Sequence, residues 1–444
     1  MTTRVILVRH GQSTYNAQKR IQGRLDESVL TEQGKADARS VGKALQGLPI
    51  DAIYSSPLQR ARQTTEEIRT TLGLSLPVNT PETLLEVDLP LWEGKLKKEI
   101  KREFPEEYRL WKRQPEAFKM TISTAEGETE HYPIAQLHAQ AKQFWQDLLA
   151  KHQDQTVLVV AHNGINRCLL STALGFGPEY YQSILQSNCG ISILNFPGAW
   201  GEGVQLESMN LTNHVGQSLP DAYEKDRIRI LLVRHGETQW NRDKRFQGIK
   251  DIPLNENGKS QGRKAAELLK DVPLDFAASS HLLRPKETAE LILEHHPDIE
   301  LQLEPQLEEI SHGLWEGMLE SEIEAAYPGM LAEWQKSPET VQMPEGENLQ
   351  QVWDRAIPAW RKIVESAKPG STGIVVAHDA INKAIVCHLF NLSPEYFWNF
   401  KQGNGAVTVI DYPYGANEKP MLKCHNITFH LSEGILDQTA AGAL

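Results

Sequence analysis

Two segments of the sequence place an arginine, a histidine and a glycine directly after a run of aliphatic residues. The first is VILVRHGQSTYN at residues 5–16, and the second is ILLVRHGETQWN at residues 230–241. Polar side chains that follow a buried strand lie at its carboxyl end, where open α/β sheets bind their ligands. The glycine lets the backbone approach a ligand closely, and a following Ser or Thr can cap a helix whose free N–H groups favour an anion.

Three further polar residues return in the same order in both halves of the chain. The first-half set is Arg9, His10, Arg60, Glu86 and His162, and the second-half set is Arg234, His235, Arg284, Glu309 and His378. Each residue alone has an ordinary structural explanation, but five matched positions that return together favour a shared function. Two arginines and two histidines facing one cleft would bind a doubly charged anion, because guanidinium groups match phosphate oxygens bidentately.

This combination of side chains predicts phosphoryl transfer. The reaction depends on positioning and on stabilising charge on the equatorial oxygens, which such a ring of donors supplies. A neutral imidazole is a competent nucleophile toward phosphorus, and the glutamate is the natural proton donor to the leaving oxygen and later the base for water. A metal site is the alternative, but the histidines lack short ligand spacing and the adjacent arginines would repel a cation.

The elements that position these residues follow the same repeat. In the first half, strands are expected at 5–8, 52–54, 157–160 and 191–195, and helices at 31–45, 57–72, 134–151 and 165–174. This alternation, repeated in the second half, predicts an α/β fold in which each half has a mostly parallel sheet with helices on both faces. We expect domains at 1–213 and 227–432, a linker at 214–226 and a flexible tail at 433–444.

The first half is longer than the second between its glutamate and its second histidine. The extra residues lie within 96–153, a charged, helical segment with a Gly/Thr-rich break at 121–132. A lid over the site and a plain surface excursion both explain it.

Composition excludes several classes of protein. The 444 residues carry a formal net charge of −12, which argues against a general nucleic-acid binder. The absence of a long apolar run argues against a membrane span, and no signal-peptide pattern is present, so we expect a cytoplasmic protein. The four scattered cysteines indicate a reducing compartment and no structural zinc.

Both halves resemble the histidine phosphatase superfamily, which has the phosphoglycerate mutase-like fold. The motifs stand here as RHGQSTYN, SSPLQRARQT, LLEVDLPLWEG and AHNGIN, and then as RHGETQWN, SSHLLRPKET, LEEISHGLWEG and AHDAIN. The resemblance implies that His10 and His235 form phosphohistidine, that Glu86 and Glu309 are the acid/base residues, and that no metal or other cofactor is needed. It further implies that the phosphoryl group is held by Arg9, Asn16, Arg60, His162, Arg234, Asn241, Arg284 and His378.

The motifs also depart from the family pattern. Pro90 replaces a glycine of the first WEG motif and can displace Glu86, and Pro285 replaces an alanine. Asn163-Gly164 and Asp379-Ala380 replace the usual Gly-Gly. None of these changes removes a catalytic group, so we expect two active sites.

A finer resemblance separates the halves. The first resembles the 2-carboxy-arabinitol 1-phosphate phosphatases of plants and cyanobacteria, and the second resembles the metal-independent phosphoserine phosphatases. By this resemblance His312 donates to the substrate carboxylate, the alternative being that it packs under Trp315. The first half has Leu89 at the matching position, so its own candidates are Lys95, Lys97 and His131.

The favoured function is a metal-independent phosphatase for small carboxylate-bearing phosphometabolites. A phosphoglycerate mutase is the close alternative, but it needs a long basic lid. The first half has a lysine-rich stretch there (Lys95, Lys97, Lys98 and Lys101), whereas the second half has acidic residues at 319–325. A third hypothesis makes one half a regulatory or scaffold domain. The expected partners are small phosphorylated metabolites, not nucleic acid or membrane, and a homodimer stays an open alternative.

Overall fold

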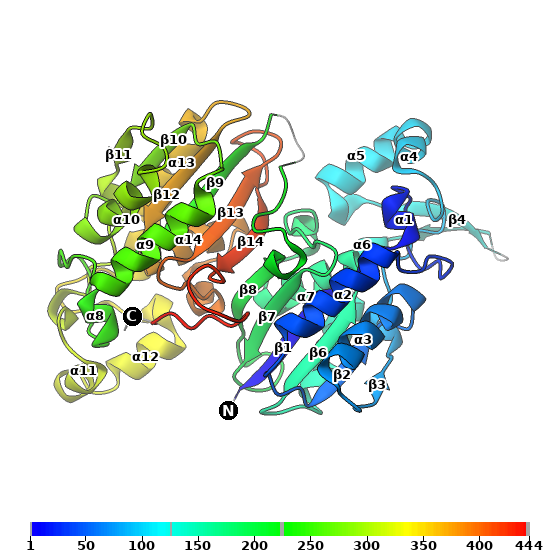
Figure 1. Ribbon diagram of the computed structural model, residues 1–444, viewed down its shortest axis with the longest axis horizontal. Coiled ribbons are helices and arrows are strands. Elements are labelled where there is room, and N and C mark those ends of the chain that lie inside the picture. Colours follow the sequence, from blue (N-terminus) through cyan, green and yellow to red (C-terminus); the bar gives the residue numbers. More distant parts are fainter. Residues whose placement is uncertain (1, 125–126, 223–225, 441–444) are drawn as a thin grey trace. The chain divides into compact units, whose positions relative to one another are not determined.

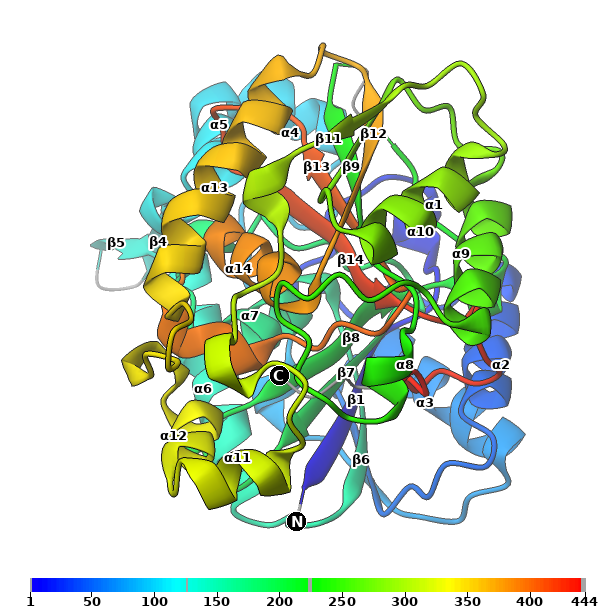
Figure 2. The ribbon, with the colours of Figure 1, turned by 90° about the vertical axis from the view of Figure 1, so that its left-hand side faces the viewer.

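The computed structural model describes residues 2–124, 127–222 and 226–440. The chain divides into two compact units, Met1–Gln217 and Ser218–Leu444. Each unit is built around one sheet with helices on both faces (Figures 1 and 2). Within the described residues, no helix is both long enough and apolar enough to span a bilayer.

The first unit's sheet has the strand order β8-β7-β1-β6-β2-β3. Its strands are β1 (Thr3–Arg9), β2 (Ala52–Ser55), β3 (Val78–Asn79), β6 (Thr156–Ala161), β7 (Ile191–Phe196) and β8 (Gln205–Leu211). The neighbouring strands β1, β6, β2 and β3 are parallel, and β7 runs antiparallel to both of its neighbours, β1 and β8. Residues 5–8 of β1 are fully buried, as expected for a strand covered on both faces.

Two pairs of helices cover this sheet. On one face α2 (Glu32–Ala44) packs against α3 (Gln59–Leu72), and on the other α6 (Pro133–Leu149) packs against α7 (Asn163–Leu174) (Figure 2). The short helix α1 (Thr14–Ala17) follows β1 directly. The α/β fold with a mostly parallel sheet is therefore confirmed.

The second unit repeats this arrangement with the strand order β11-β10-β12-β9-β13-β14. Its strands are β9 (Ile228–Arg234), β10 (Phe276–Ser279), β11 (Leu301–Leu303), β12 (Thr372–Ala377), β13 (Val407–Tyr412) and β14 (Met421–Ile427). Its helices are α8 (Gln239–Arg242), α9 (Glu256–Leu269), α10 (Leu283–Leu293), α13 (Leu349–Ser366) and α14 (Asp379–Leu389). Figure 2 shows α9 and α10 on one side of these strands and α13 and α14 on the other.

Each unit also carries a two-helix cap, which we define as α4 (Lys97–Glu103) with α5 (Pro105–Arg113) in the first and α11 (Glu320–Ala326) with α12 (Met330–Lys336) in the second. The first cap is held by aromatic contacts of Trp111 on α5, whose ring centre lies 5.8 Å from that of Trp92 and 5.3 Å from that of Tyr181. The break expected at 121–132 is largely a hairpin of β4 (Met120–Thr124) and β5 (Gly127–His131), and residues 125–126 lie outside the described residues.

Short 3-10 helices complete the fold. They are Glu82–Leu84, Pro115–Ala117, Pro178–Tyr180, Asn213–Val215, Pro305–Leu307, Gly313–Trp315, Pro338–Thr340 and Pro394–Asn399. Part of the expected linker, 223–225, and the end of the expected tail, 441–444, lie outside the described residues. The described part of that tail is anchored, because the buried Asp437 carboxylate accepts from Asn426 Nδ2 at 3.2 Å and pairs with Lys401 at 3.4 Å.

A buried ion pair in the second unit gives a test of the fold. The Asp411 carboxylate receives two bonds from Arg229, at 2.7 and 2.8 Å, and lies 3.6 Å from Lys423 Nζ. We expect Asp411→Asn to lower the free energy of unfolding by about 3–5 kcal/mol, because it leaves buried cations without their carboxylate. Urea unfolding measures this. Lys35→Ala, which removes an exposed pair with Glu32, should leave the midpoint unchanged, and an equally stable Asp411→Asn variant would contradict the expectation.

Candidate active site

The repeated segments end β1 and β9, so each places its histidine at the carboxyl end of a central strand. His10 Nδ1 lies 2.7 Å from the carbonyl oxygen of Gly11, and His235 Nδ1 lies 2.7 Å from that of Gly236. A carbonyl only accepts hydrogen bonds, so Nδ1 carries the proton and Nε2 presents a lone pair. Burial, followed by the neighbouring arginines, holds the pKa of both histidines well below the usual range, so the rings are neutral.

The two glycines are needed for a close backbone approach rather than for a left-handed conformation. A Cβ on Gly11 would lie 2.4 Å from the carbonyl oxygen of Gly34, and one on Gly236 would lie 2.4 Å from that of Gly258. Helices α2 and α9 thus press directly on the turn that carries each histidine, and only glycine leaves room for them.

A buried arginine from the helix after β2 or β10 faces each of these histidines. Arg60 donates to the carbonyls of Gly23 (2.8 Å) and Leu25 (2.9 Å), and Arg284 donates likewise to Gly248 and Lys250. These bonds engage both terminal nitrogens of each guanidinium group, so Nε–H is the donor that faces the histidine. In the second unit Arg284 Nε lies 3.3 Å from His235 Nε2, so a ligand oxygen bound to Arg284 Nε would also lie next to His235 Nε2. Burial lowers the pKa of Arg60 and Arg284 to about 10, which keeps them charged at neutral pH.

The second histidine of each set packs edge-on against the first. The ring centres of His10 and His162 are 5.1 Å apart, and those of His235 and His378 are 5.2 Å apart. His162 Nε2 lies 2.7 Å from Ser56 Oγ, and a hydroxyl that donates to Nε2 leaves the proton on Nδ1. Within the described part of the chain Nδ1 is buried and has no protein partner, so it can donate to an anion.

Ser280 holds His378 in the same way, at 2.9 Å. Sequence reasoning quoted the SSPL and SSHL motifs but assigned their serines no role. The sequence feature that could have identified them is the second serine, which recurs in both halves just before a predicted helix.

The arginines that precede the first histidines are anchored to a later loop. Arg9 Nη1 donates to the carbonyl of Gln186 at 2.7 Å, and Arg234 Nη1 donates to that of Gln402. The Nε atoms of both arginines are buried, and they have no partner among the described residues. They are therefore available to an anion.

The predicted asparagines lie beside these arginines. Asn16 Oδ1 accepts from the backbone of Ser13 (3.2 Å) and from Asn188 Nδ2 (3.2 Å), and Asn241 is held in the same way by Thr238 and Asn404. Because the oxygen of each amide is occupied, the amide nitrogen is the group left for a ligand. Asn188 and Asn404, which hold these amides and also donate to the carbonyls of His10 and His235, were not predicted as part of the site.

The glutamates differ between the units. Glu86 accepts three backbone bonds, from Val87 (2.8 Å), Gly164 (3.0 Å) and Ile165 (3.0 Å), so Pro90 does not displace it. Among the described residues, Glu309 accepts from two backbone groups, Ile310 at 3.0 Å and Ala380 at 3.5 Å.

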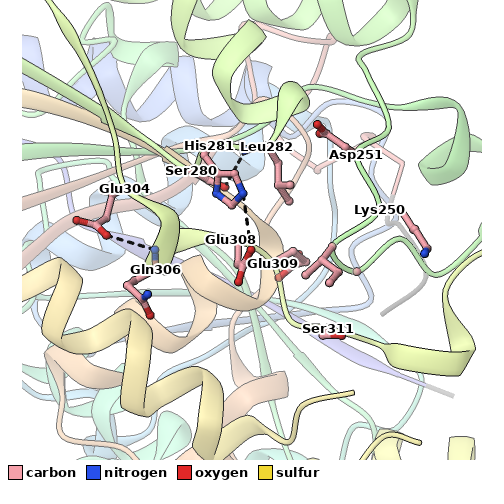
Figure 3. A network of polar contacts seen from close by, with 12 residues as sticks. Lys250, Asp251, Ser280, His281, Leu282, Glu304, Gln306, Glu308, Glu309 and Ser311 are labelled. Carbon is pink, nitrogen blue, oxygen red and sulfur yellow. Dashed lines mark hydrogen bonds and ion pairs between the residues drawn. The ribbon is translucent and has the colours of Figure 1, made fainter. Parts of the chain in front are cut away.

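Burial, and then the neighbouring Asp379, raises the pKa of Glu309. Figure 3 separates this residue from its neighbour Glu308, whose side chain is 35% exposed and points to His281.

One small pocket brings most of the second set together. It is lined by Arg234, His235, Asn241, Gln247, Gly248, Arg284, Glu309 and His312. Six of these were predicted from the sequence, whereas Gln247 and Gly248 were not. Gln247 accepts from the Thr238 hydroxyl at 2.8 Å, and Gly248 supplies the carbonyl that orients Arg284.

His312 lies in this pocket but in an unexpected state. Its Nδ1 is 2.8 Å from Met343 Sδ, and the ring packs against Phe246 rather than directly under Trp315. Burial lowers the pKa of His312 to about 3, so the ring is neutral. A thioether has no proton to give, so Nδ1 is the donor and the buried Nε2 presents a lone pair.

Of the three first-unit candidates for substrate binding, two contact other protein groups and one lies near the site. His131 Nε2 lies 3.0 Å from the carbonyl oxygen of Asp88, in the loop after Glu86, and Lys95 pairs with Glu103 on α4 at 3.0 Å, so both already have protein partners. The pKa of Lys97 is lowered by burial and then by Arg9 and Arg167, which places this lysine near the site.

The titratable groups outside the two sets suggest no further centre of this kind. Among the described residues, no group of three or more His, Cys, Asp or Glu side chains is placed to hold a metal ion. The four cysteines are buried free thiols, and burial raises their pKa.

Known proteins match this chain in both halves. The family model of the histidine phosphatase superfamily (branch 1) matches residues 5–212 and 230–426. The chain is 33% identical to the 2-carboxy-D-arabinitol-1-phosphatase of Triticum aestivum over 96% of this chain and 86% of that protein. It is 33% identical to a probable 2-carboxy-D-arabinitol-1-phosphatase of Arabidopsis thaliana over 97% and 88%. Phosphoserine phosphatase 1 of Hydrogenobacter thermophilus is 35% identical over 46% of this chain and 95% of that protein.

Proposed function

The chain belongs to the histidine phosphatase superfamily and is a phosphoric monoester hydrolase, and we propose that each unit is a complete, metal-independent site for small phosphomonoesters that bear a carboxylate. The substrate class follows the names of the relatives, since 2-carboxy-arabinitol 1-phosphate and phosphoserine both fit it. The observation that carries the proposal is the matched pair of neutral histidines, each with Nδ1 fixed by a carbonyl and Nε2 facing arginine.

The proposed reaction has two transfers on the same histidine. Nε2 of His10 or His235 attacks phosphorus, and the bond from phosphorus to the leaving oxygen breaks in line with the attack. Charge on the phosphoryl oxygens is met by the Nε–H groups of the arginines, by the asparagine amide and by Nδ1–H of His162 or His378. Water then attacks the phosphohistidine, releasing phosphate and the free imidazole.

The glutamates would carry the proton in both steps. Glu86 or Glu309 gives its proton to the leaving oxygen in the first transfer and takes a proton from water in the second. Each glutamate contacts the backbone at the start of the helix that follows the second histidine, α7 or α14, which aligns it with that histidine. This placement supports a role at the leaving-group side of the phosphoryl group.

A mutase would need a different environment around the same groups. It must retain a bisphosphorylated intermediate and exclude water, which calls for a basic cap. The cap of the second unit begins with Glu320, Glu322 and Glu324 on α11, so its charge opposes such an intermediate. This charge favours hydrolysis over mutase activity in the second unit.

A screen of phosphate release without added metal tests the proposal. The substrates are sugar phosphates, phosphoserine and phosphoglycerate, each assayed with the wild type and with His10→Ala and His235→Ala separately. We expect each single variant to keep the activity of the other unit and to lose part of the substrate range. Transfer to phosphoglycerate with negligible phosphate release would support a mutase, and full activity after one change would support a regulatory unit.

His312 gives a prediction about substrate recognition in the second unit. Its Nε2 lone pair can accept a hydrogen bond from a substrate ammonium or hydroxyl group, whereas donation to a carboxylate requires the other tautomer. We expect His312→Leu to raise the Michaelis constant for phosphoserine by about 10- to 150-fold, since one hydrogen bond to a charged group is worth about 1.5–3 kcal/mol. The Michaelis constant for an aryl phosphate should be unchanged.

Two further substrates separate the tautomers. With phosphoethanolamine, which has an ammonium group and no carboxylate, the acceptor role predicts the same loss. With phosphoglycolate, which has a carboxylate and neither ammonium nor hydroxyl, the donor role predicts it instead. Equal losses for all substrates, or none, would make His312 structural only.

A further inference from the structure

One pair of buried residues differs between the otherwise matched sites. The helix after the second histidine carries Asn163 and Arg167 in the first unit and Asp379 and Lys383 in the second. Asp379 Oδ1 lies 3.2 Å from Arg234 Nη1, and its Oδ2 lies 2.6 Å from Lys383 Nζ. The side chains of all three are at most 6% exposed, so this ion pair network is shielded from water.

The first unit has no matching carboxylate. Arg167 donates to the carbonyl of Tyr181 at 3.2 Å and to Gln182 Oε1 at 2.9 Å, which are neutral groups. Within the described ranges its Nε is buried without a partner, and no acidic side chain lies within ion-pair distance of Arg9. Both cations also contact aromatic rings, with Arg167 Cζ 5.2 Å from the ring centre of Tyr181 and Lys383 Nζ 4.7 Å from that of Phe397 and 4.4 Å from that of Trp398.

The second unit is therefore the more negative of the two around the phosphoryl position. In the first unit the arginines at 9, 60 and 167, with Lys97 beside them, face the carboxylate of Glu86. In the second unit Arg234, Arg284 and Lys383 face two carboxylates, those of Glu309 and Asp379. Because these groups are buried, solvent screens this difference weakly.

We propose that Asp379 is a specificity-determining residue. It makes the second unit select phosphomonoesters in which the rest of the molecule, apart from the phosphoryl group, is uncharged or zwitterionic. The first unit, with Asn163 in its place, takes those in which this remainder is anionic. This inference rests on the proposed phosphatase function. Asp379 neutralises Lys383 and occupies one side of the Arg234 guanidinium, so the second unit retains enough positive charge for a phosphoryl group and little for another anion.

Asp379 also acts on the proposed acid. The charged groups that face Glu309 are Asp379 and Lys383 from α14, Arg284 from α10 and Arg234 at the end of β9. Among these only Asp379 is negative, and it raises the pKa of Glu309. Removing its charge should therefore make Glu309 lose its proton at lower pH, which gives a readout that a purely structural role would not move.

The experiment exchanges the two pairs in single-site proteins. The second unit is isolated by His10→Ala, and the pair Asp379→Asn/Lys383→Arg then installs the first unit's residues. The first unit is isolated by His235→Ala, and Asn163→Asp is the reciprocal change. For each protein we compare kcat/KM for 3-phosphoglycerate, whose remainder is anionic, with kcat/KM for phenyl phosphate, whose remainder is uncharged.

We expect the ratio of 3-phosphoglycerate to phenyl phosphate to rise about tenfold in the exchanged second unit and to fall in the Asn163→Asp first unit. The alkaline limb of the pH profile of kcat/KM in the second unit should move down by about one pH unit. If the exchanged second unit does not fold, the Asn163→Asp variant alone decides between the outcomes.

Three results would overturn the inference. An unchanged ratio and an unchanged alkaline limb in active proteins would show that Asp379 does not select substrates, and a uniform loss at every pH would make it structural only. An inactive His10→Ala parent would instead show that the proposed function of the second unit is wrong, and the inference would fall with it.

Discussion

Replacing both His10 and His235 with alanine should abolish phosphate release, lowering kcat by at least about 10⁴-fold. The reason is that Nε2 of these two histidines is the attacking atom of the proposed reaction, and in the second unit it lies 3.3 Å from the buried Arg284 Nε. Rapid quenching of the wild type with labelled substrate should trap an acid-labile, base-stable phosphoprotein, as expected for phosphohistidine. The double variant should give none, while far-ultraviolet circular dichroism and the unfolding midpoint stay as in the wild type.

A third histidine provides the matched control. His152 precedes β6 at the opposite end of the first unit's sheet, where it contacts the hydroxyl of Tyr54 and Gln155. His152→Ala should keep both turnover and trapping. Label that survives acid on serine or threonine, or trapping that persists in the double variant, would assign the covalent step to another residue.

The single variants measure how the two sites share the work. If each unit is complete, His10→Ala and His235→Ala should each trap about half of the label per chain. Trapping that disappears entirely with one change would show that only one unit reacts, although both have the same arginines and paired histidines.

Much of the fold could be predicted because the central strands are aliphatic and the site motifs return twice. Strand β8 could not, because its sequence QLESMNL buries polar residues such as Glu207 and Asn210 inside the sheet. Burial of that kind depends on partners elsewhere in the chain, which local periodicity does not report. The hairpin β4–β5 was missed for a related reason, since its β5 strand is mostly exposed and lacks an apolar face.

The site residues were found by type and order, but their chemical states required the structure. The proton of His312 is placed by Met343, which lies 31 residues away in the sequence. The serines that orient His162 and His378 come from the turns after β2 and β10, and their role depends on a contact between distant strands. The difference between Glu86 and Glu309 likewise follows from the number of backbone donors each one meets and from Asp379.

Replacing Glu86 or Glu309 with glutamine should slow poor leaving groups most. An alkyl phosphate leaves as a strongly basic alkoxide and needs a proton in the transition state, so kcat should fall by about 10²–10⁴-fold at the altered site. An activated aryl phosphate such as 4-nitrophenyl phosphate leaves without that help and should lose much less. The measurement is kcat/KM for both substrates in proteins with the other unit inactivated through its histidine.

The role of Glu309 as a general acid also predicts the direction in which activity changes with pH. The general acid works only while protonated, so activity toward alkyl phosphates should decline as pH rises through the pKa of Glu309. Because burial and Asp379 raise that pKa, the protonated acid should persist to higher pH in the second unit than an ordinary glutamic acid would. In Glu309→Gln the amide does not titrate, so this alkaline limb should disappear from the small residual activity.

Glu308 is the control that the chain itself offers, since it directly precedes Glu309 but turns outward to His281 (Figure 3). Glu308→Gln should change neither substrate's kcat/KM by more than about twofold, because surface ion pairs contribute little. Equal losses for alkyl and aryl phosphates in Glu309→Gln would mean that the carboxylate positions the site rather than donating a proton. If Glu308→Gln instead reproduced the selective loss, the proton donor would be the outer glutamate, and the buried pocket around Glu309 would have to serve another purpose.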